Sequence, residues 1–294
     1  MEFSGTLKGN RRCRAGFALA VSGVLAATAG IFPAFAESPA PAAIPVPVVS
    51  YSDLADLGDS SGLVLRAQVR KVTAIDPARA RGVRPGYGRF LIEARTQALL
   101  FGAGAMGESL RYLADLRLDA KGKPPKLRKA MVLLFANPVP GRPGELQLVA
   151  PDAQVPWDAV SEGKLRAVLG ELHGPAVPPR ITGVREAIHV SGTLAGEGET
   201  QLFLATADDS ATALTVTRIP GRVPAWSVSF SEVAGAGSPP PMHETLAWYR
   251  LACFLPAELP RAVNLSEGRA QRLMAEEDYR LVRRELGECG RLRN

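Results

Sequence analysis

Short extended runs separated by glycine and proline dominate the chain between Leu63 and Val155. The first run, residues 63–72, is rich in β-branched side chains and alternates roughly between apolar and polar residues, which is typical of a half-buried strand. Four more runs follow, at residues 90–101, 109–116, 130–136 and 145–149. Short strands with this punctuation predict a closed or nearly closed antiparallel barrel.

The order of these runs resembles that of a small OB-type barrel. A first strand leads into a basic loop (residues 76–86), then a longer strand, a second basic loop, an apolar strand and a closing hairpin. The resemblance covers residues 63–155 and implies a ligand-binding face that is often aromatic and basic. Aromatic residues make up only 6% of the chain, so we expect core packing for most of its rings. The side chains available for such a face are Tyr87, Phe90, Tyr112, Arg66, Arg89 and Arg111.

A second unit is predicted after the barrel. Helical spacing over residues 157–172 stops at His173-Gly174, and the Pro178-Pro179 pair prevents its continuation. The predicted fold class is therefore α+β: mainly antiparallel β with an OB-like N-terminal barrel, a second small β-sheet unit and a helical C-terminal tail. The extended runs of the second unit are residues 181–190, 200–206, 213–218 and 225–230, and its helices are residues 244–255 and 266–286.

The N-terminus has the three zones of a signal peptide. Basic residues from Lys8 to Arg14 precede an apolar run from Ala15 to Phe32, and small residues at Ala34 and Ala36 suit signal peptidase. We therefore predict a signal peptide over residues 1–36 and a periplasmic or secreted protein. A retained transmembrane anchor is the alternative, and Arg11-Arg12 leaves twin-arginine export open beside the Sec route.

The domain organisation follows from these segments. A Pro/Ala-rich tether is predicted over residues 37–50, because proline removes backbone donors and favours extended chain. The OB-like barrel with its terminal helix is assigned to residues 51–175. The sheet unit with its helical tail is assigned to residues 176–294.

The net charge gives little reason to expect a polyanionic partner. The leader carries four of the 35 basic and one of the 29 acidic residues, so the exported chain keeps 31 and 28, a net charge of +3. We therefore expect neither a nucleic-acid partner nor an anionic membrane surface as a partner. No segment after the leader is apolar for long enough to cross a bilayer, so we also expect no integral membrane segment once the signal is cleaved.

The cysteines predict one disulfide. Cys13 leaves with the signal, and Cys253 and Cys289 remain, 36 positions apart. Two cysteines in an exported chain most simply pair with each other. A metal site is the weaker interpretation, because two thiols without a nearby histidine pair supply too few ligands.

Four segments resemble uncharacterised exported proteins of alphaproteobacteria. The resemblance implies a shared fold and carries no known activity. The segments are LVLRAQVRK (63–71), ESLRYL (108–113), GRPGELQLVAPDAQ (141–154) and AWYRLACFLP (247–256).

No cofactor or metal site is predicted. The stretch from Gly102 to Gly107 has the spelling G-x-G-x-x-G, but a dinucleotide site also needs a long helix directly after it, and Lys121-Gly-Lys-Pro-Pro interrupts the chain too soon. The three histidines stand alone, and His243-Glu244 does not continue into H-E-x-x-H.

Weak catalytic candidates lie around one predicted turn. His189 and Ser191 could belong to a serine triad, and Glu199 with Glu197 could act as acid and base or bind calcium with Asp208-Asp209. A structural histidine and a solvated acidic turn are the simpler interpretations. We therefore favour a non-catalytic binding or envelope-accessory module whose partner is an envelope protein or a small ligand, with a periplasmic hydrolase around His189 and Glu197/Glu199 as the alternative.

Overall fold

The computed structural model describes residues 49–103, 107–230 and 237–293. The predicted signal peptide over residues 1–36 lies outside these residues. Of the predicted tether over residues 37–50, only the last two positions are described.

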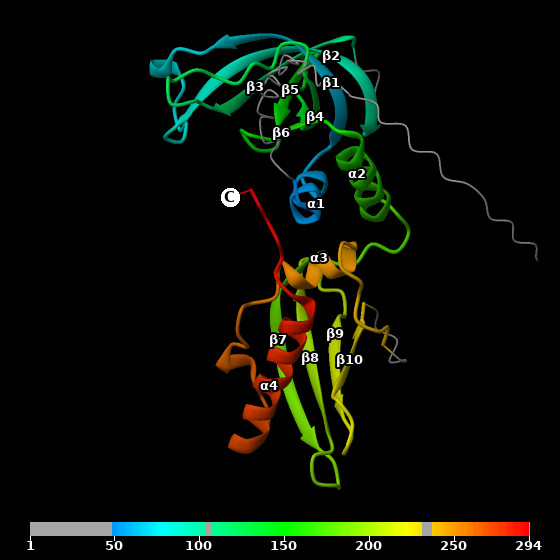
Figure 1. Ribbon diagram of the computed structural model, residues 1–294. Helices are drawn as coiled ribbons and strands as arrows, with labels where there is room; N and C mark the ends of the chain where they lie inside the picture. The colour runs from blue at the N-terminus through cyan, green and yellow to red at the C-terminus, as the bar shows by residue number, and fades with distance from the viewer. Residues whose placement is uncertain (1–48, 104–106, 231–236, 294) are drawn as a thin grey trace, which may run out of the picture. The chain divides into compact units, whose positions relative to one another are not determined.

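The N-terminal strands form a closed barrel (Figure 1). They pair in the order β1-β2-β3-β5-β4, and β4 pairs back onto β1, while β6 shares the other edge of β4 with β5. The predicted α+β class with an OB-like barrel is thereby confirmed. The strands are β1 (Leu63–Ala74), β2 (Tyr87–Phe101), β3 (Ser109–Arg117), β4 (Met131–Pro138), β5 (Glu145–Leu148) and β6 (Gln154–Pro156).

One pairing in the ring differs from the antiparallel barrel that the sequence predicted. β3 and β5 run parallel, and the other pairings are antiparallel. A ring of five strands cannot alternate direction throughout, so one pair must be parallel. The sequence also gave no sign of β6, which has only three residues.

The interior of the barrel comes from the alternating apolar side chains of its strands. β1 pairs with β2 along its length and with β4 through residues 63–68, so it bends between two neighbours. Three register shifts between Val64 and Lys71 allow this bend, because an extra residue in one strand increases its local twist. Leu65, Ile92 and Leu134 are fully buried in the core.

Two helices pack beside the barrel. In α1 (Tyr51–Asp59), Ser50 and Asp53 form a capping box, each side chain accepting a hydrogen bond from the other's backbone N–H at 3.1 Å. α2 (Ala159–Leu172) is capped by Asp158, whose carboxylate accepts a hydrogen bond from the Ser161 backbone N–H. The helices approach closely at Gly58, where a Cβ atom would lie only 3.2 Å from a methyl carbon of Leu172.

The C-terminal part of the chain contains a second sheet of four antiparallel strands in the order β10-β9-β8-β7. Helix α4 (Gly268–Leu286) packs on β7 and β8 (Figure 1). The strands are β7 (Ile181–Ser191), β8 (Gly198–Thr206), β9 (Ala213–Arg218) and β10 (Ala225–Ser229), and β9 and β10 form an antiparallel hairpin. Helix α3 (Leu246–Ala252) is shorter than the predicted 244–255, because Glu244 has a positive φ of 56° and Thr245 is the N-cap.

The C-terminal strap, residues 287–293, crosses helix α1. Its third residue, Cys289, lies at disulfide distance from Cys253, with Cα atoms 4.7 Å apart, as predicted. Arg291 then binds both carboxylate oxygens of Asp56 at 2.6 and 2.9 Å. The backbone N–H groups of Leu292 and Arg293 donate to Asp53, so the strap is held at several points along α1.

Among the described residues, none of the helices combines the length and the apolar character that crossing a bilayer requires.

Removing the Cys253–Cys289 link should destabilise the fold. We expect the paired substitution Cys253→Ser/Cys289→Ser to lower the free energy of unfolding by about 3 to 4 kcal/mol, because a loop of this length is no longer closed in the unfolded chain. Urea unfolding with and without a thiol reductant measures this. The reductant should weaken the wild type to the same extent and leave the double variant unchanged. Two free thiols in protein isolated from the cell envelope would contradict the pairing.

Candidate functional site

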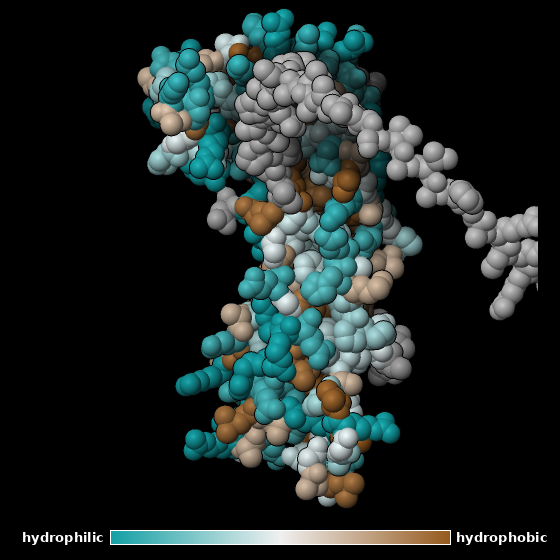
Figure 2. Space-filling model, in the orientation of Figure 1, coloured by the Kyte–Doolittle hydropathy of each residue, from teal (hydrophilic) through white to brown (hydrophobic). Residues whose placement is uncertain are grey.

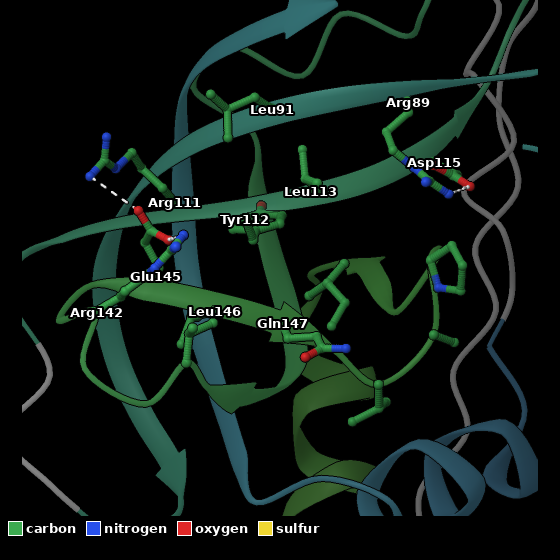
Figure 3. A pocket seen from close by; sticks show the side chains of 15 residues that line it. Arg89, Leu91, Arg111, Tyr112, Leu113, Asp115, Arg142, Glu145, Leu146 and Gln147 are labelled. Carbon is green, nitrogen blue, oxygen red and sulfur yellow. Dashed lines mark hydrogen bonds and ion pairs between the residues drawn. The ribbon is translucent and has the colours of Figure 1, made fainter. Parts of the chain in front are cut away.

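A groove runs along the outer face of the barrel between β3 and β5. The two strands pair only at Arg111–Glu145 and Tyr112–Leu146, after which they separate. The segment that follows β5 returns to β3 where the Asp115 backbone N–H donates to the Pro151 carbonyl oxygen at 2.7 Å. The opening between these two points has a volume of about 670 Å³ (Figure 3).

The floor of the groove is apolar. Leu91 on β2 lies directly across from Leu113 on β3, and both side chains point away from the barrel core. Leu113 remains 48% exposed, which is high for a leucine at the centre of a strand. In Figure 3 the two leucines lie between two polar ends.

A tight ion pair forms one polar end of the groove. Arg89 donates to both carboxylate oxygens of Asp115 at 2.7 and 2.9 Å. The hydrogen bonds to Asp115 raise the pKa of Arg89 above its usual value. Because Asp115 is buried, this pair is part of the fold and fixes the end of the groove.

A looser cluster forms the other end. Arg111 on β3 and Arg142 on the β4–β5 loop share the carboxylate of Glu145 at 3.5 and 3.3 Å (Figure 3). Their side chains are 60% and 69% exposed. Two guanidinium groups on one carboxylate leave a net positive charge beside the leucines, so this end can accept an anionic group.

The structure divides the binding-face residues proposed from the sequence. Arg89, Arg111 and Tyr112 line the groove, although the Tyr112 ring is almost fully buried, and Phe90 is buried inside the barrel away from the groove. Burial raises the pKa of Tyr112, and its hydroxyl donates to Gln154. Tyr87 is half-buried beneath the guanidinium of Arg84, 4.6 Å from its ring centre.

Arg66 faces away from the groove, toward α2. It forms an ion pair with the buried carboxylate of Glu162 at 2.9 Å, and its guanidinium lies over the ring of Trp157. Arg66 therefore fastens the helix to β1.

Sequence reasoning missed the two groove leucines and Arg142. The alternation of β3 could have identified Leu113. Side chains at every second position of a strand share one face, so Leu113 faces outward together with Arg111 and Asp115. Arg142 lies far along the chain from β3, and its position beside Arg111 depends on the parallel pairing.

His189 lies in a buried network between β7, β8 and α4. The Thr200 hydroxyl donates its only proton to Asp278, so it must accept from His189 Nδ1, 2.8 Å away. Arg218 donates to the same Asp278 carboxylate at 2.7 Å, and the His189 backbone N–H donates to Ser266 at 2.9 Å. Burial lowers the pKa of His189 and favours the neutral ring, with the Asp278 charge opposing and the Arg218 charge adding to this effect. The network ties α4 to the sheet.

The other catalytic candidates lie apart from this network. Glu199 pairs with Val190 and so faces the opposite side of the sheet from His189, and its exposed carboxylate accepts from Gln201. Ser191 is exposed at the end of β7. Glu197 accepts from the backbone N–H groups at positions 193 and 194 and so closes its own turn.

No metal or nucleotide site forms from the remaining motifs in the described residues. Asp208-Asp209 follows the far end of β8 from Glu199, so the carboxylates suggested for calcium are separated by the length of the strand. Within residues 49–103, 107–230 and 237–293, no three metal-binding side chains cluster. The Gly102–Gly107 segment joins two antiparallel strands, and β3 follows it where a dinucleotide site needs a helix; its residues 104–106 lie outside the described part.

Charge is distributed unevenly over the chain. The barrel region, residues 63–157, carries 16 basic and 7 acidic residues, a net charge of +9. Residues 158–294 carry 15 basic and 17 acidic residues. The small net charge of residues 37–294 therefore hides a strongly basic barrel, and the expectation of no polyanionic partner loses its support from the summed charge.

No protein-family model matches the chain, and no curated protein is significantly similar to it.

The buried imidazole makes stability depend on pH. The pKa of His189 is lowered from 6.5 in the folded protein, so below pH 6.5 the unfolded chain takes up a proton that the folded chain resists. We expect the free energy of unfolding to be highest above this pH and to fall on acidification until the folded ring also protonates. His189→Asn retains a donor toward Thr200 and should lose this pH dependence. Urea unfolding at several pH values measures both proteins, and the same pH dependence in the variant would contradict the assignment.

Proposed function

We propose that the protein is exported and acts as a non-catalytic binding module, with the groove between β3 and β5 as its ligand site. The observation that carries the proposal is the half-exposed Leu113 between a fixed ion pair and a loosely paired arginine cluster. An apolar floor with few convergent polar groups is what a specific binding site requires.

The chemistry of the groove favours a ligand with an apolar portion and an acidic group. The apolar portion would cover Leu91 and Leu113, and the acidic group would displace Glu145 from Arg111 and Arg142. A segment of an envelope protein or a small amphiphilic acid has this composition. Displacing Glu145 costs little free energy, because its ion pairs with the two arginines are long and exposed.

Export is supported by the leader pattern and by the cysteine pair. A link between Cys253 and Cys289 persists in oxidising compartments such as the periplasm and is rare in the cytosol. The sequence resemblance to exported alphaproteobacterial proteins points in the same direction. We therefore place the working protein in the periplasm or outside the cell, with its leader removed after Ala36.

Cleavage after Ala36 can be read directly from the protein. N-terminal sequencing or intact-mass measurement of the chain from an envelope fraction should give Glu37 as the first residue, because Ala34 and Ala36 match the two small-residue positions of signal peptidase. Recovery of the chain with residues 1–36 attached would contradict it, and membrane-bound material would favour the anchor.

The groove can be tested with an exposed carboxylate on its floor. Leu113→Asp should reduce capture of a ligand from envelope extract at least tenfold, which corresponds to the loss of about 1.4 kcal/mol of binding free energy. Leu99→Asp is a matched control, because Leu99 on β2 is similarly exposed, at 41%, and does not line the groove. Quantitative mass spectrometry of the captured material measures the difference. A ligand retained equally by both variants would place binding elsewhere.

A further inference from the structure

One end of the barrel concentrates exposed positive charge. Two loops meet there, residues 75–86 between β1 and β2 and residues 117–130 between β3 and β4, and the Leu118 backbone N–H donates to the Gly86 carbonyl at 2.8 Å. Together they contain nine basic and two acidic residues. We call this surface the basic end. It lies at the upper left of Figures 1 and 2, where the surface is mostly hydrophilic.

Most of these cations are free. None of the following side chains, all exposed, forms an ion pair with a described residue: Arg79, Arg81, Arg117, Lys121, Lys123, Lys126, Arg128 and Lys129. Unpaired like charges this close repel one another, so the surface gains by meeting an anionic partner.

The two carboxylates in the loops do not neutralise the basic end. Asp119 accepts from the backbone N–H groups of Lys121 and Lys123, both at 2.8 Å. Asp76 accepts from the backbone N–H of Ala78 at 2.9 Å. Both are used to shape the turns that present the cations.

The second loop is held in place across the end of the barrel. It leaves β3 beside Gly86 and returns at Lys129, whose backbone N–H donates to Val69 on β1 at 2.8 Å. Leu118 and Leu127 pack against the core, and the lysines point outward. Pro124-Pro125 further restricts the loop, so little entropy is lost when it meets a partner.

We propose that the basic end docks the protein on an anionic lipid surface. Lysines without neighbouring aromatic rings act as point charges toward a field of phosphates, as polybasic segments do at membranes. Nucleic-acid strands are instead held by stacking on aromatic side chains, and neither loop contains an aromatic residue. The adjacent Tyr87 is already covered by Arg84. None of the residues that line the groove lies in either loop, although Arg89 at the end of the groove donates to the Arg81 carbonyl oxygen of the first loop at 3.2 Å.

The test uses the chain from Glu37 onward, which contains every element of the fold without the apolar leader. Its binding to phosphatidylglycerol-containing vesicles and to pure phosphatidylcholine vesicles is measured by co-sedimentation. We expect binding only to the anionic vesicles, weakening as salt increases. Equal binding to both vesicle types, or to neither, would overturn the proposal.

Charge reversal locates the surface. Lys121→Glu/Lys123→Glu/Lys126→Glu should lower affinity for the anionic vesicles by on the order of a hundredfold or more. The matched control, Arg222→Glu/Arg261→Glu/Arg269→Glu, changes the net charge equally at exposed positions outside the barrel and should change affinity less than about twofold. Circular dichroism checks that both variants remain folded. Equal losses in the two variants would show a general charge effect and overturn the assignment, as would tighter binding of a single-stranded oligonucleotide than of the anionic vesicles.

Discussion

Closure of the barrel by the parallel pairing of β3 with β5 is the constraint on which the rest of the structure depends. It brings Arg111 beside Glu145, and it places the β4–β5 loop with Arg142 at the edge of β3. Because the pairing covers only two positions, it also leaves the groove open above Leu113. The same ring places the β1–β2 and β3–β4 loops at one end, where their cations accumulate. Binding groove and basic end are thus two consequences of one topology.

Acidic groups on α1 hold the barrel to the C-terminal part of the chain. Asp56 and Asp53 receive the strap, and Asp59 binds Arg250 of α3, which is 2% exposed, at 2.8 Å. The Arg250 and Arg180 hydrogen bonds and charges outweigh burial and lower the pKa of Asp59, so it stays ionised beside them. A carboxylate that pairs with a buried arginine is costly to remove, because the arginine would be left uncompensated. The Asp53 and Asp56 contacts hold the C-terminal end of the strap on α1, and the Cys253–Cys289 pair links the start of the strap to the residue that follows α3.

Much of the fold could be predicted from the sequence, because alternation and Gly/Pro punctuation are local. The runs at 63–72, 109–116 and 213–218 coincide closely with β1, β3 and β9. The candidate site could not be predicted in the same way, because it depends on contacts between distant segments. The sequence suggests a triad member at His189 beside Ser191. Its partner in the structure is Thr200, 11 positions further along the chain, and Thr200 in turn bonds Asp278, another 78 positions away. The basic end could not be predicted from the net charge of the chain, because that sum combines the excess of basic residues in the barrel with the excess of acidic residues after it.

Residue-resolved amide hydrogen exchange at β3 tests the closure of the barrel most directly. The Arg111 N–H donates to the Gly144 carbonyl at 2.8 Å and the Asp115 N–H to the Pro151 carbonyl at 2.7 Å, at the two ends of the groove. Both amides should exchange as slowly as those of the β1–β2 pair, because their hydrogen bonds break only when the barrel opens between β3 and the segment that includes β5. Exchange of both at the rate of an unstructured chain would show that β3 and β5 are not joined, and the groove and its charge arrangement would then not exist.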